Sequence, residues 1–315
     1  MQYCAVKSAY EVAEILRVGE VVSTDALVAA LDALAGEPWS DAMYQAKRAI
    51  TLALFASSSK EAVHRAIAEI GSHAPGTIRG VLFDEGDALS EPFPENPWGI
   101  APSATLVGAI DHVWDVFDAP NLTNALLERV LGLVLLDTHD GPQLGYLHVH
   151  ELSSFQVAEA HAGVPRPPHD RRYAQHWLPF GDMSMFAGAA PSIAPRGTSC
   201  AVPAPLQILY RVHGGMHDGM WNLSGPDQLI TWAQMLDVDP SHVVRAADED
   251  EKIRADQLVC FFGYGDDRSD LFDIRDPDEP VIRAWGDGQL YEGAGTPFLE
   301  WLEDQTSLIL GIQED

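Results

Sequence analysis

The sequence has few basic residues for its length. Only 19 of the 315 residues are Lys or Arg, against 47 Asp and Glu, which gives a formal net charge of −28 at pH 7. Proteins that bind nucleic-acid phosphates or anionic membranes do so with clustered Lys and Arg side chains. The composition therefore argues against nucleic-acid and membrane partners, and it favours a basic protein as the partner.

Cysteine and long apolar runs are also scarce. The three cysteines, Cys4, Cys200 and Cys260, cannot all pair with one another and show no CxxC spacing, so we expect neither a disulfide framework nor a zinc ribbon. The longest apolar run, Val130 to Leu136, is far shorter than the roughly 20 residues of a membrane span. Because the N-terminus lacks the pattern of a signal peptide, we expect a cytoplasmic protein.

Familiar catalytic and cofactor motifs are missing. The sequence contains no GxSxG, no GxxxxGK[ST] and no HExxH, so it predicts no cofactor. The sharpest chemical feature is a pair of histidines, His148 and His150, which would share one face of a strand. With His139, Asp140 and Glu151 nearby in the sequence, the set is compatible with a metal ion. A strand that carries polar residues on one face explains the same pattern without a metal.

Length and pattern predict two parts. Residues 1–140 read as a mainly helical region of unassigned role, and residues 141–315 as an α+β domain with a Pro-rich insertion near 163–205. Apolar residues at helical spacing predict helices in the first part at 24–35, 40–56, 62–70, 103–117 and 122–136. Ser58 and Glu61 predict a capping box for the third of these helices.

The second part alternates between helical and strand patterns, which is typical of an α+β fold. Helices are expected at 205–213, 226–236 and from 296 onward, and strands at 220–223, 257–262, 270–274 and 280–285.

Acidic residues are concentrated in the last quarter of the chain. From Asp237 to Asp315 there are 21 Asp and Glu but only 6 Lys and Arg. A solvated acidic surface explains this concentration, and so does a docking surface for a cationic protein, where complementary charge raises the association rate. The candidate partner-binding residues are the tightest acidic group and one neighbouring aromatic: Asp266, Asp267, Asp270, Asp273, Asp276, Asp278, Glu279 and Trp285.

Five segments of the C-terminal part carry a family resemblance. They are LQILYRVHGG (206–215), WNLSGPDQLITWAQM (221–235), LVCFFGYGDDRSDLFDI (258–274), VIRAWGDGQ (281–289) and FLEWLED (298–304). In this order they resemble the SUKH superfamily, which includes yeast cell-wall-assembly regulators and many bacterial immunity proteins. The family usually carries an LP pair shortly before its glycine turn, whereas here Leu178-Pro179 is separated from Gly214 by the Pro-rich insertion.

The resemblance implies an antiparallel sheet with flanking helices and a non-enzymatic protein-binding function. Bacterial relatives neutralise toxins by direct binding, so the expected partner is a basic, nuclease-like toxin that is blocked by occlusion. The family shares no catalytic residues that could be transferred to this sequence. Two alternatives stay open: a metal-dependent hydrolase that uses His148 and His150, and an intracellular regulatory scaffold. The oligomeric state is not predicted.

Overall fold

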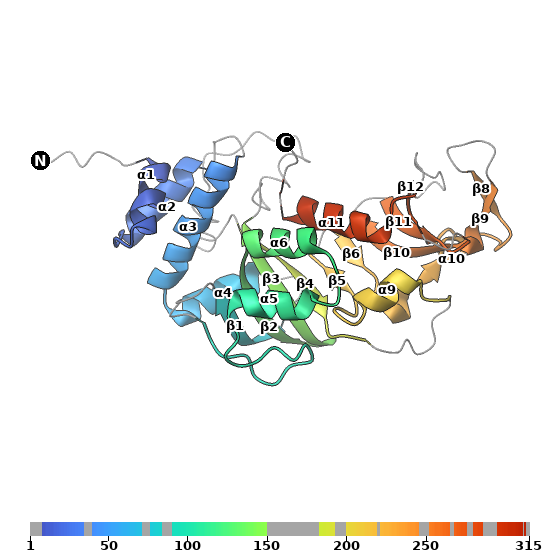
Figure 1. The fold of residues 1–315 in the computed structure, drawn as a ribbon, viewed down its shortest axis with the longest axis horizontal. Coiled ribbons are helices and arrows are strands. Elements are labelled where there is room, and N and C mark those ends of the chain that lie inside the picture. Colours follow the sequence, from blue (N-terminus) through green and yellow to red (C-terminus); the bar gives the residue numbers. More distant parts are fainter. Residues whose placement is uncertain are drawn as a thin grey trace, which may run out of the picture.

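The protein is an α+β structure built on one large antiparallel sheet, seen here in a computed structural model (Figure 1). The structure describes residues 8–34, 40–70, 76–83, 90–149, 183–192, 200–218, 221–245, 252–264, 268–275, 280–285, 295–310 and 312. Ten strands form the main sheet in the order β1-β2-β3-β4-β5-β6-β10-β11-β12, with β7 paired to β10, and β8 and β9 form a separate hairpin. The predicted α+β class is confirmed.

Four helices begin the described chain: α1 (Ala9–Arg17), α2 (Thr24–Leu34), α3 (Asp41–Ser57) and α4 (Lys60–Ile70). The Ser40 side chain accepts from the Met43 amide and so caps α3. The predicted capping box puts the N-cap of α4 at Ser58, one residue before the observed cap, Ser59. Ser59 accepts from the Ala62 amide and caps α4, while the Ser58 hydroxyl donates to the Leu54 carbonyl at the end of α3.

The strands β1 (Gly76–Phe83), β2 (Val130–Thr138), β3 (Gly141–Val149) and β4 (Met183–Ala189) form a meander. The prediction of a helix at 122–136 is wrong after residue 129, where α6 ends and β2 begins. Residues 130–136 are buried on both faces of the sheet. A continuous apolar run has no periodicity that separates a buried strand from a buried helix, which explains the error.

β4 lies within the predicted Pro-rich insertion, where loops were expected. Its middle residues are buried, and Tyr146 of β3 stacks on Phe186 with 4.6 Å between ring centroids. Gly188 is required at its position, because a Cβ atom there would lie 2.1 Å from His213 Nδ1. The Ser, Ala and Gly residues of β4 and the proline-rich segments on either side of it are typical of loops. For this reason the sequence did not predict this central strand.

Two helices connect β1 to β2, α5 (Leu106–Trp114) and α6 (Pro120–Arg129). Thr105 caps α5 by accepting from the Gly108 amide, and Pro120 stands at the start of α6, where its missing N–H costs nothing. Both helices bury one apolar face, which holds them against the sheet.

The sheet narrows in its middle. After α9 (Ala204–Leu209), Gly215 adopts a φ of +130°, and the short strands β5 (Met216–His217) and β6 (Trp221–Leu223) connect the two ends of the sheet. The single helix predicted at 226–236 is broken into η1 (Pro226–Gln228), β7 (Ile230–Thr231) and α10 (Trp232–Met235). β7 pairs with β10, so sheet pairing outweighs the helical spacing of these residues.

The C-terminal end of the sheet consists of β10 (Leu258–Tyr264), β11 (Arg268–Asp273) and β12 (Val281–Trp285). The helix α11 (Phe298–Ile309) follows and packs on one face. β8 (Val243–Arg245), β9 (Lys252–Arg254) and η2 (Ala255–Gln257) contribute to a small core on the opposite face. The sequence predicted a strand at the position of each of β10, β11 and β12.

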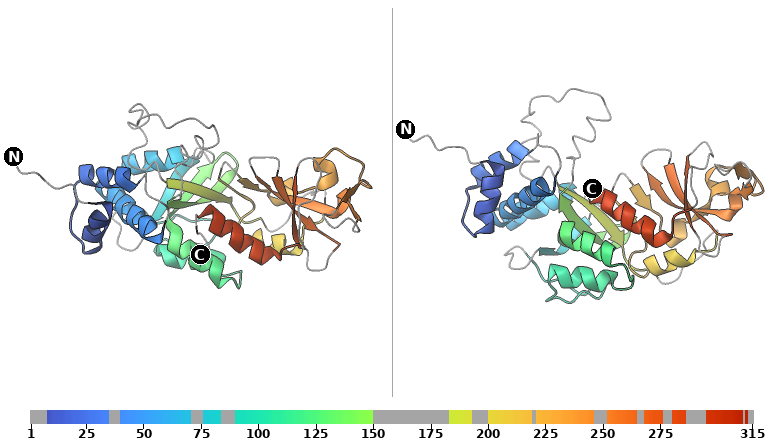
Figure 2. Two further views of the ribbon diagram at one scale, coloured as in Figure 1. Left: turned by 90° about the horizontal axis from the view of Figure 1, so that it is seen from above. Right: turned by 45° about the horizontal axis from the view of Figure 1, so that its top comes forward.

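Helices cover both faces of the sheet (Figure 2). Residues of α5, α6, α9 and α11 share one core with strands from both ends of the sheet. α3 and α4 pack on the opposite face of β1 to β4, and α1 and α2 pack against α3. Within the described residues no helix is long and apolar enough to cross a membrane.

The boundary predicted at 140 and 141 does not divide the sheet. Thr138 pairs with Gly141 across the turn of the β2–β3 hairpin, so the meander continues through the boundary. The first 140 residues are rich in helix, but they also supply β1 and β2 to the same sheet.

Candidate functional site

Asp270, one of the predicted partner-binding residues, is buried in the centre of a polar cluster. Its side chain is 1% exposed. Arg283 of β12 donates from Nε to Oδ1 at 2.8 Å and from Nη2 to Oδ2 at 3.2 Å. The Trp301 indole N–H of α11 donates to Oδ2 at 2.8 Å. The prediction that Asp270 faces a partner is therefore corrected, because its carboxylate is saturated by donors of its own chain.

Tyr264 completes this cluster. Its hydroxyl donates to Asp270 Oδ2 at 2.8 Å and lies 3.1 Å from Gln305 Oε1 of α11. Burial, followed by the charge of Asp270, raises the pKa of Tyr264, so the phenol stays protonated and remains a donor. Trp301 and Gln305 belong to α11, while the other members belong to the sheet. The cluster consequently fixes the helix on the sheet.

Asp273 is also turned inward. It is 6% exposed, and Arg275 donates to it from Nε at 2.9 Å and from Nη2 at 2.6 Å. This pair closes the turn after β11, so Asp273 too is corrected from partner-binding to structural. The remaining predicted acidic residues lie outside the described part of the chain: Asp266, Asp267, Asp276, Asp278 and Glu279.

Trp285 lies at the end of β12 and is half-buried. The guanidinium carbon of Arg268 lies 5.7 Å from the Trp285 ring centroid and 4.7 Å from that of Tyr264. Arg268 is thus held by two aromatic rings, which is a stabilising cation–π arrangement. Trp, Tyr and Arg are the residue types most common in binding hot spots. The role of Trp285 as a partner-binding residue therefore stays a prediction.

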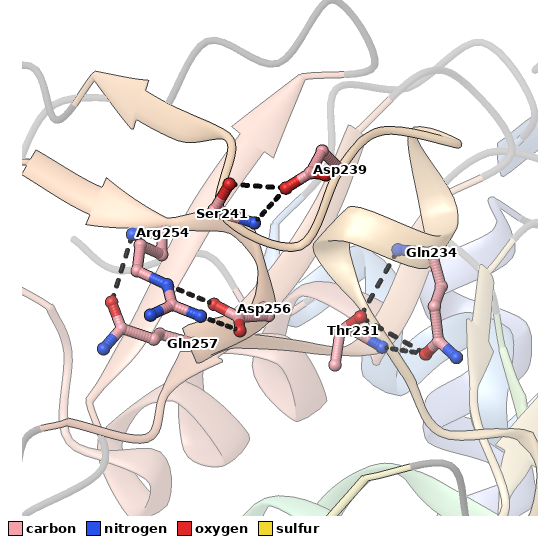
Figure 3. A network of polar contacts seen from close by, with 7 residues as sticks. All are labelled: Thr231, Gln234, Asp239, Ser241, Arg254, Asp256 and Gln257. Atoms are coloured by element: carbon pink, nitrogen blue, oxygen red, sulfur yellow. Dashed lines mark hydrogen bonds and ion pairs between the residues drawn. The ribbon is translucent and has the colours of Figure 1, made fainter.

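Sequence reasoning missed a group of acidic side chains beside the β8–β9 hairpin (Figure 3). The Asp239 carboxylate accepts from the backbone N–H and the hydroxyl of Ser241, and these hydrogen bonds lower the pKa of Asp239. Arg254 donates to Asp256 from Nε at 3.0 Å. These contacts hold the hairpin in place. Their signal was available in the sequence as the Asp-x-Ser turn at 239–241.

Asp237 stands in the same region with an unusual backbone. It has a φ of +53° at the end of α10, where the Val238 amide donates to the Ala233 carbonyl. This is a Schellman motif, whose left-handed position is normally glycine. The side chain of Asp237 is exposed.

His139 and His148 of the predicted metal set do not come together. His148 is 1% exposed within β3, whereas His139 and Asp140 are exposed at the tip of the β2–β3 hairpin. A strand rises roughly 3.3 Å per residue, which puts the hairpin tip more than about 20 Å from His148. His150 and Glu151 lie outside the described residues. Among the residues that the structure does describe, no three His, Cys, Asp or Glu side chains could hold a metal.

A second buried polar network crosses the main core. Trp114 Nε1 donates to the Tyr146 hydroxyl at 3.1 Å, and that hydroxyl lies 2.8 Å from His213 Nε2. Burial lowers the pKa of His213 to about 3 and raises that of Tyr146. Both groups are therefore neutral near pH 7, and both are fully buried. The side chains of Tyr146 and His213 therefore contribute to the packing of the core, since a buried group is out of reach of a substrate.

The cavity beneath α11 is small. Its volume is about 20 Å³, and its walls include Trp114, Phe186, Trp221 and Trp301. A cavity of this size has room for about one water molecule. It therefore offers no space for a substrate.

Comparison with protein-family models, with curated proteins and with solved structures finds no match to this chain. The class that the structure itself defines is an α+β protein in which two buried polar clusters, around Asp270 and around Tyr146, join helices to a sheet.

Proposed function

We propose that this protein is a non-enzymatic protein-binding module, an immunity-type protein that neutralises a basic, nuclease-like toxin by occlusion. The observation that carries the proposal is the order of elements after residue 200. A short helix and glycine turn and the strands β5 and β6 are followed by η1, β7, α10 and the β8–β9 hairpin, and then by η2, the meander β10-β11-β12 and the closing helix α11. The antiparallel meander with its closing helix supports the resemblance to SUKH proteins.

Net charge supports a cationic partner. With −28 on the whole chain, a basic protein is attracted over the distance that salt leaves unscreened, about 8 Å at physiological ionic strength. Complementary charge raises association rates and selects against acidic competitors. An inhibitor of a toxic enzyme needs fast association, because damage accumulates until the enzyme is blocked.

The hydrogen bonds of Asp270 and the burial of His213 support a binding function over a catalytic one. Asp270 has four donors from its own chain within hydrogen-bond distance, and His213 is enclosed by Trp98, Trp114 and Tyr146. The catalytic groups of an enzyme must reach substrate. Asp270 and His213 would be the first candidates for catalytic residues, but their contacts stabilise the fold.

Co-expression tests the proposal. The probes are the basic, nuclease-like domains encoded by genes that flank the gene for this protein, each expressed with and without the full chain. We expect restored growth, and we expect a stoichiometric complex in size-exclusion chromatography with an inactive toxin variant. The mass of the toxin should be unchanged after release from the complex, because occlusion alters no covalent bond. Absence of both the complex and the protection would overturn the proposal.

A further inference from the structure

The outer surface of α5, α6 and α11 forms one continuous helical layer on the sheet. α6 packs against both α5 and α11, and Asn121 Nδ2 of α6 donates to Glu303 Oε2 of α11 at 3.5 Å. Figures 1 and 2 show α6 beside α11 from different directions. The three helices come from distant parts of the chain, so only the folded protein brings their outer faces together.

Every exposed charge on this layer is negative. Residues 106–129 and 298–309 contain no Lys, and their one Arg, Arg129, is buried against the ring of Tyr44. The carboxylates on the outer side of these segments come from seven residues: Asp111, Asp115, Asp118, Glu128, Glu300, Glu303 and Asp304. His112 is the one other ionisable group exposed on these two segments.

The helices on the opposite face carry charges of both signs. α1 to α4 include exposed Arg17, Lys60 and Arg65 among their acidic residues. Two of these cations pair with acids, Arg17 with Glu14 and Lys60 with Glu91. The uniform negative sign therefore belongs to α5, α6 and α11 and is not spread evenly over the protein.

Large apolar side chains are exposed on the same layer. Leu308 is 67% exposed, and Val107, Val116 and Leu299 are also among the exposed large hydrophobic residues. On a docking surface such apolar groups would supply contact, and the charges around them would supply orientation.

We propose that the outer face of α5, α6 and α11 is the docking surface for the basic partner, which rests on the proposed protein-binding function. Lysine and arginine side chains of the partner would pair with the carboxylates, and an apolar group would cover Leu308. Positive charge on the partner is required, because an acidic or neutral surface would leave the carboxylates other than Glu128, which already pairs with Arg129, facing repulsion or desolvation. This surface differs from the loops of the C-terminal sheet, where the acidic sequence first placed the partner.

A charge-reversal triple variant tests the location. It combines Asp111→Lys, Glu300→Lys and Asp304→Lys, three exposed residues on α5 and α11. The matched control, Glu20→Lys, Asp25→Lys and Asp32→Lys, changes the net charge equally on exposed residues near or within α2. A third variant, Leu308→Ser, removes the apolar contact. Far-UV circular dichroism and thermal melting establish that each variant is folded.

The probe is the same inactive basic toxin domain, and binding is measured by stopped-flow association and by affinity. We expect the docking-face triple variant to associate at least about tenfold more slowly and to lose most of its salt dependence. Leu308→Ser should raise the dissociation rate, while the α2 control should retain at least half of the wild-type association rate. Equal losses in both triple variants, or none in the docking-face variant, would overturn this location. In either case wild-type binding would still uphold the proposed function, whereas failure of the wild type to bind would remove both.

Discussion

The indole N–H of Trp301 in α11 donates to the buried carboxylate of Asp270 in β11 over 2.8 Å. This hydrogen bond joins the last helix to the C-terminal end of the sheet. It also explains why the most central acidic residue of the C-terminal part is withdrawn from solvent. A buried charge is tolerated only when it is paired and hydrogen-bonded, and Arg283 together with Trp301 meets that requirement.

Trp301→Phe removes this donor and keeps most of the aromatic packing. We expect the free energy of unfolding to fall by about 1.5–3 kcal/mol, because the lost hydrogen bond is to a charged acceptor. Urea denaturation followed by circular dichroism measures the change. Trp285→Phe is the matched control and should cost less than about 1 kcal/mol, since that ring is half-buried. Equal losses in both variants would contradict the role of the hydrogen bond.

Asp270→Asn leaves Arg283 without its carboxylate partner. A buried ion pair that loses one member typically costs about 3–5 kcal/mol, and Arg283 is partly exposed, so we expect about 2–4 kcal/mol here. Asp256→Asn breaks the more exposed pair with Arg254 and should cost at most about 1 kcal/mol. The comparison uses chemical denaturation at pH 7. A loss for Asp270→Asn as small as that of the control would show that the cluster contributes little.

Acid should destabilise the protein through His213. Burial lowers its pKa in the folded state to about 3, while an unfolded histidine titrates near its ordinary value of about 6.5. Below that ordinary value the unfolded chain therefore binds more protons than the folded chain. This contribution to stability is complete above about pH 6.5 and is lost by up to about 1.4 kcal/mol per pH unit as the pH falls toward 3.

His213→Gln keeps a neutral polar side chain and removes this titration. We expect its stability, measured by urea denaturation between pH 7 and pH 4.5, to fall less steeply with acid than that of the wild type. The absolute stability of the variant will be lower, because the hydrogen bond with Tyr146 is altered. The slope with pH is the decisive quantity, and identical slopes in the two proteins would refute the assignment.

Asp237→Gly should stabilise the fold. Asp237 holds a φ of +53°, a conformation that costs an L-residue about 1–2 kcal/mol and glycine almost nothing. The extra flexibility of glycine in the unfolded chain offsets about 0.5–1 kcal/mol of this gain. We expect a net increase of about 0.5–1 kcal/mol in the free energy of unfolding. Asp237→Ala, which keeps the strain, should show no such increase, and a gain in both variants would point to charge as the cause.

The sequence alone determined many of the helices and the strands β10, β11 and β12. Helical spacing predicted α3, because the apolar periodicity of a helix is a local signal, whereas its cap at Ser40 was found only in the structure. Short strand patterns separated by turns likewise predicted β10, β11 and β12. The sign of the charge and the absence of common catalytic motifs are also properties of the sequence itself.

The tertiary structure decided what those residues face. The run from Val130 to Leu136 became a strand because β1 and β3 pair with it on either side. Asp270 and Asp273 turned inward because Arg283 and Arg275 lie within reach of them. The uniformly acidic layer exists only because α11 packs beside α6 across more than 150 residues of sequence. Local signals encode local geometry, whereas burial, ion pairing and surface charge depend on neighbours that only the folded chain brings together.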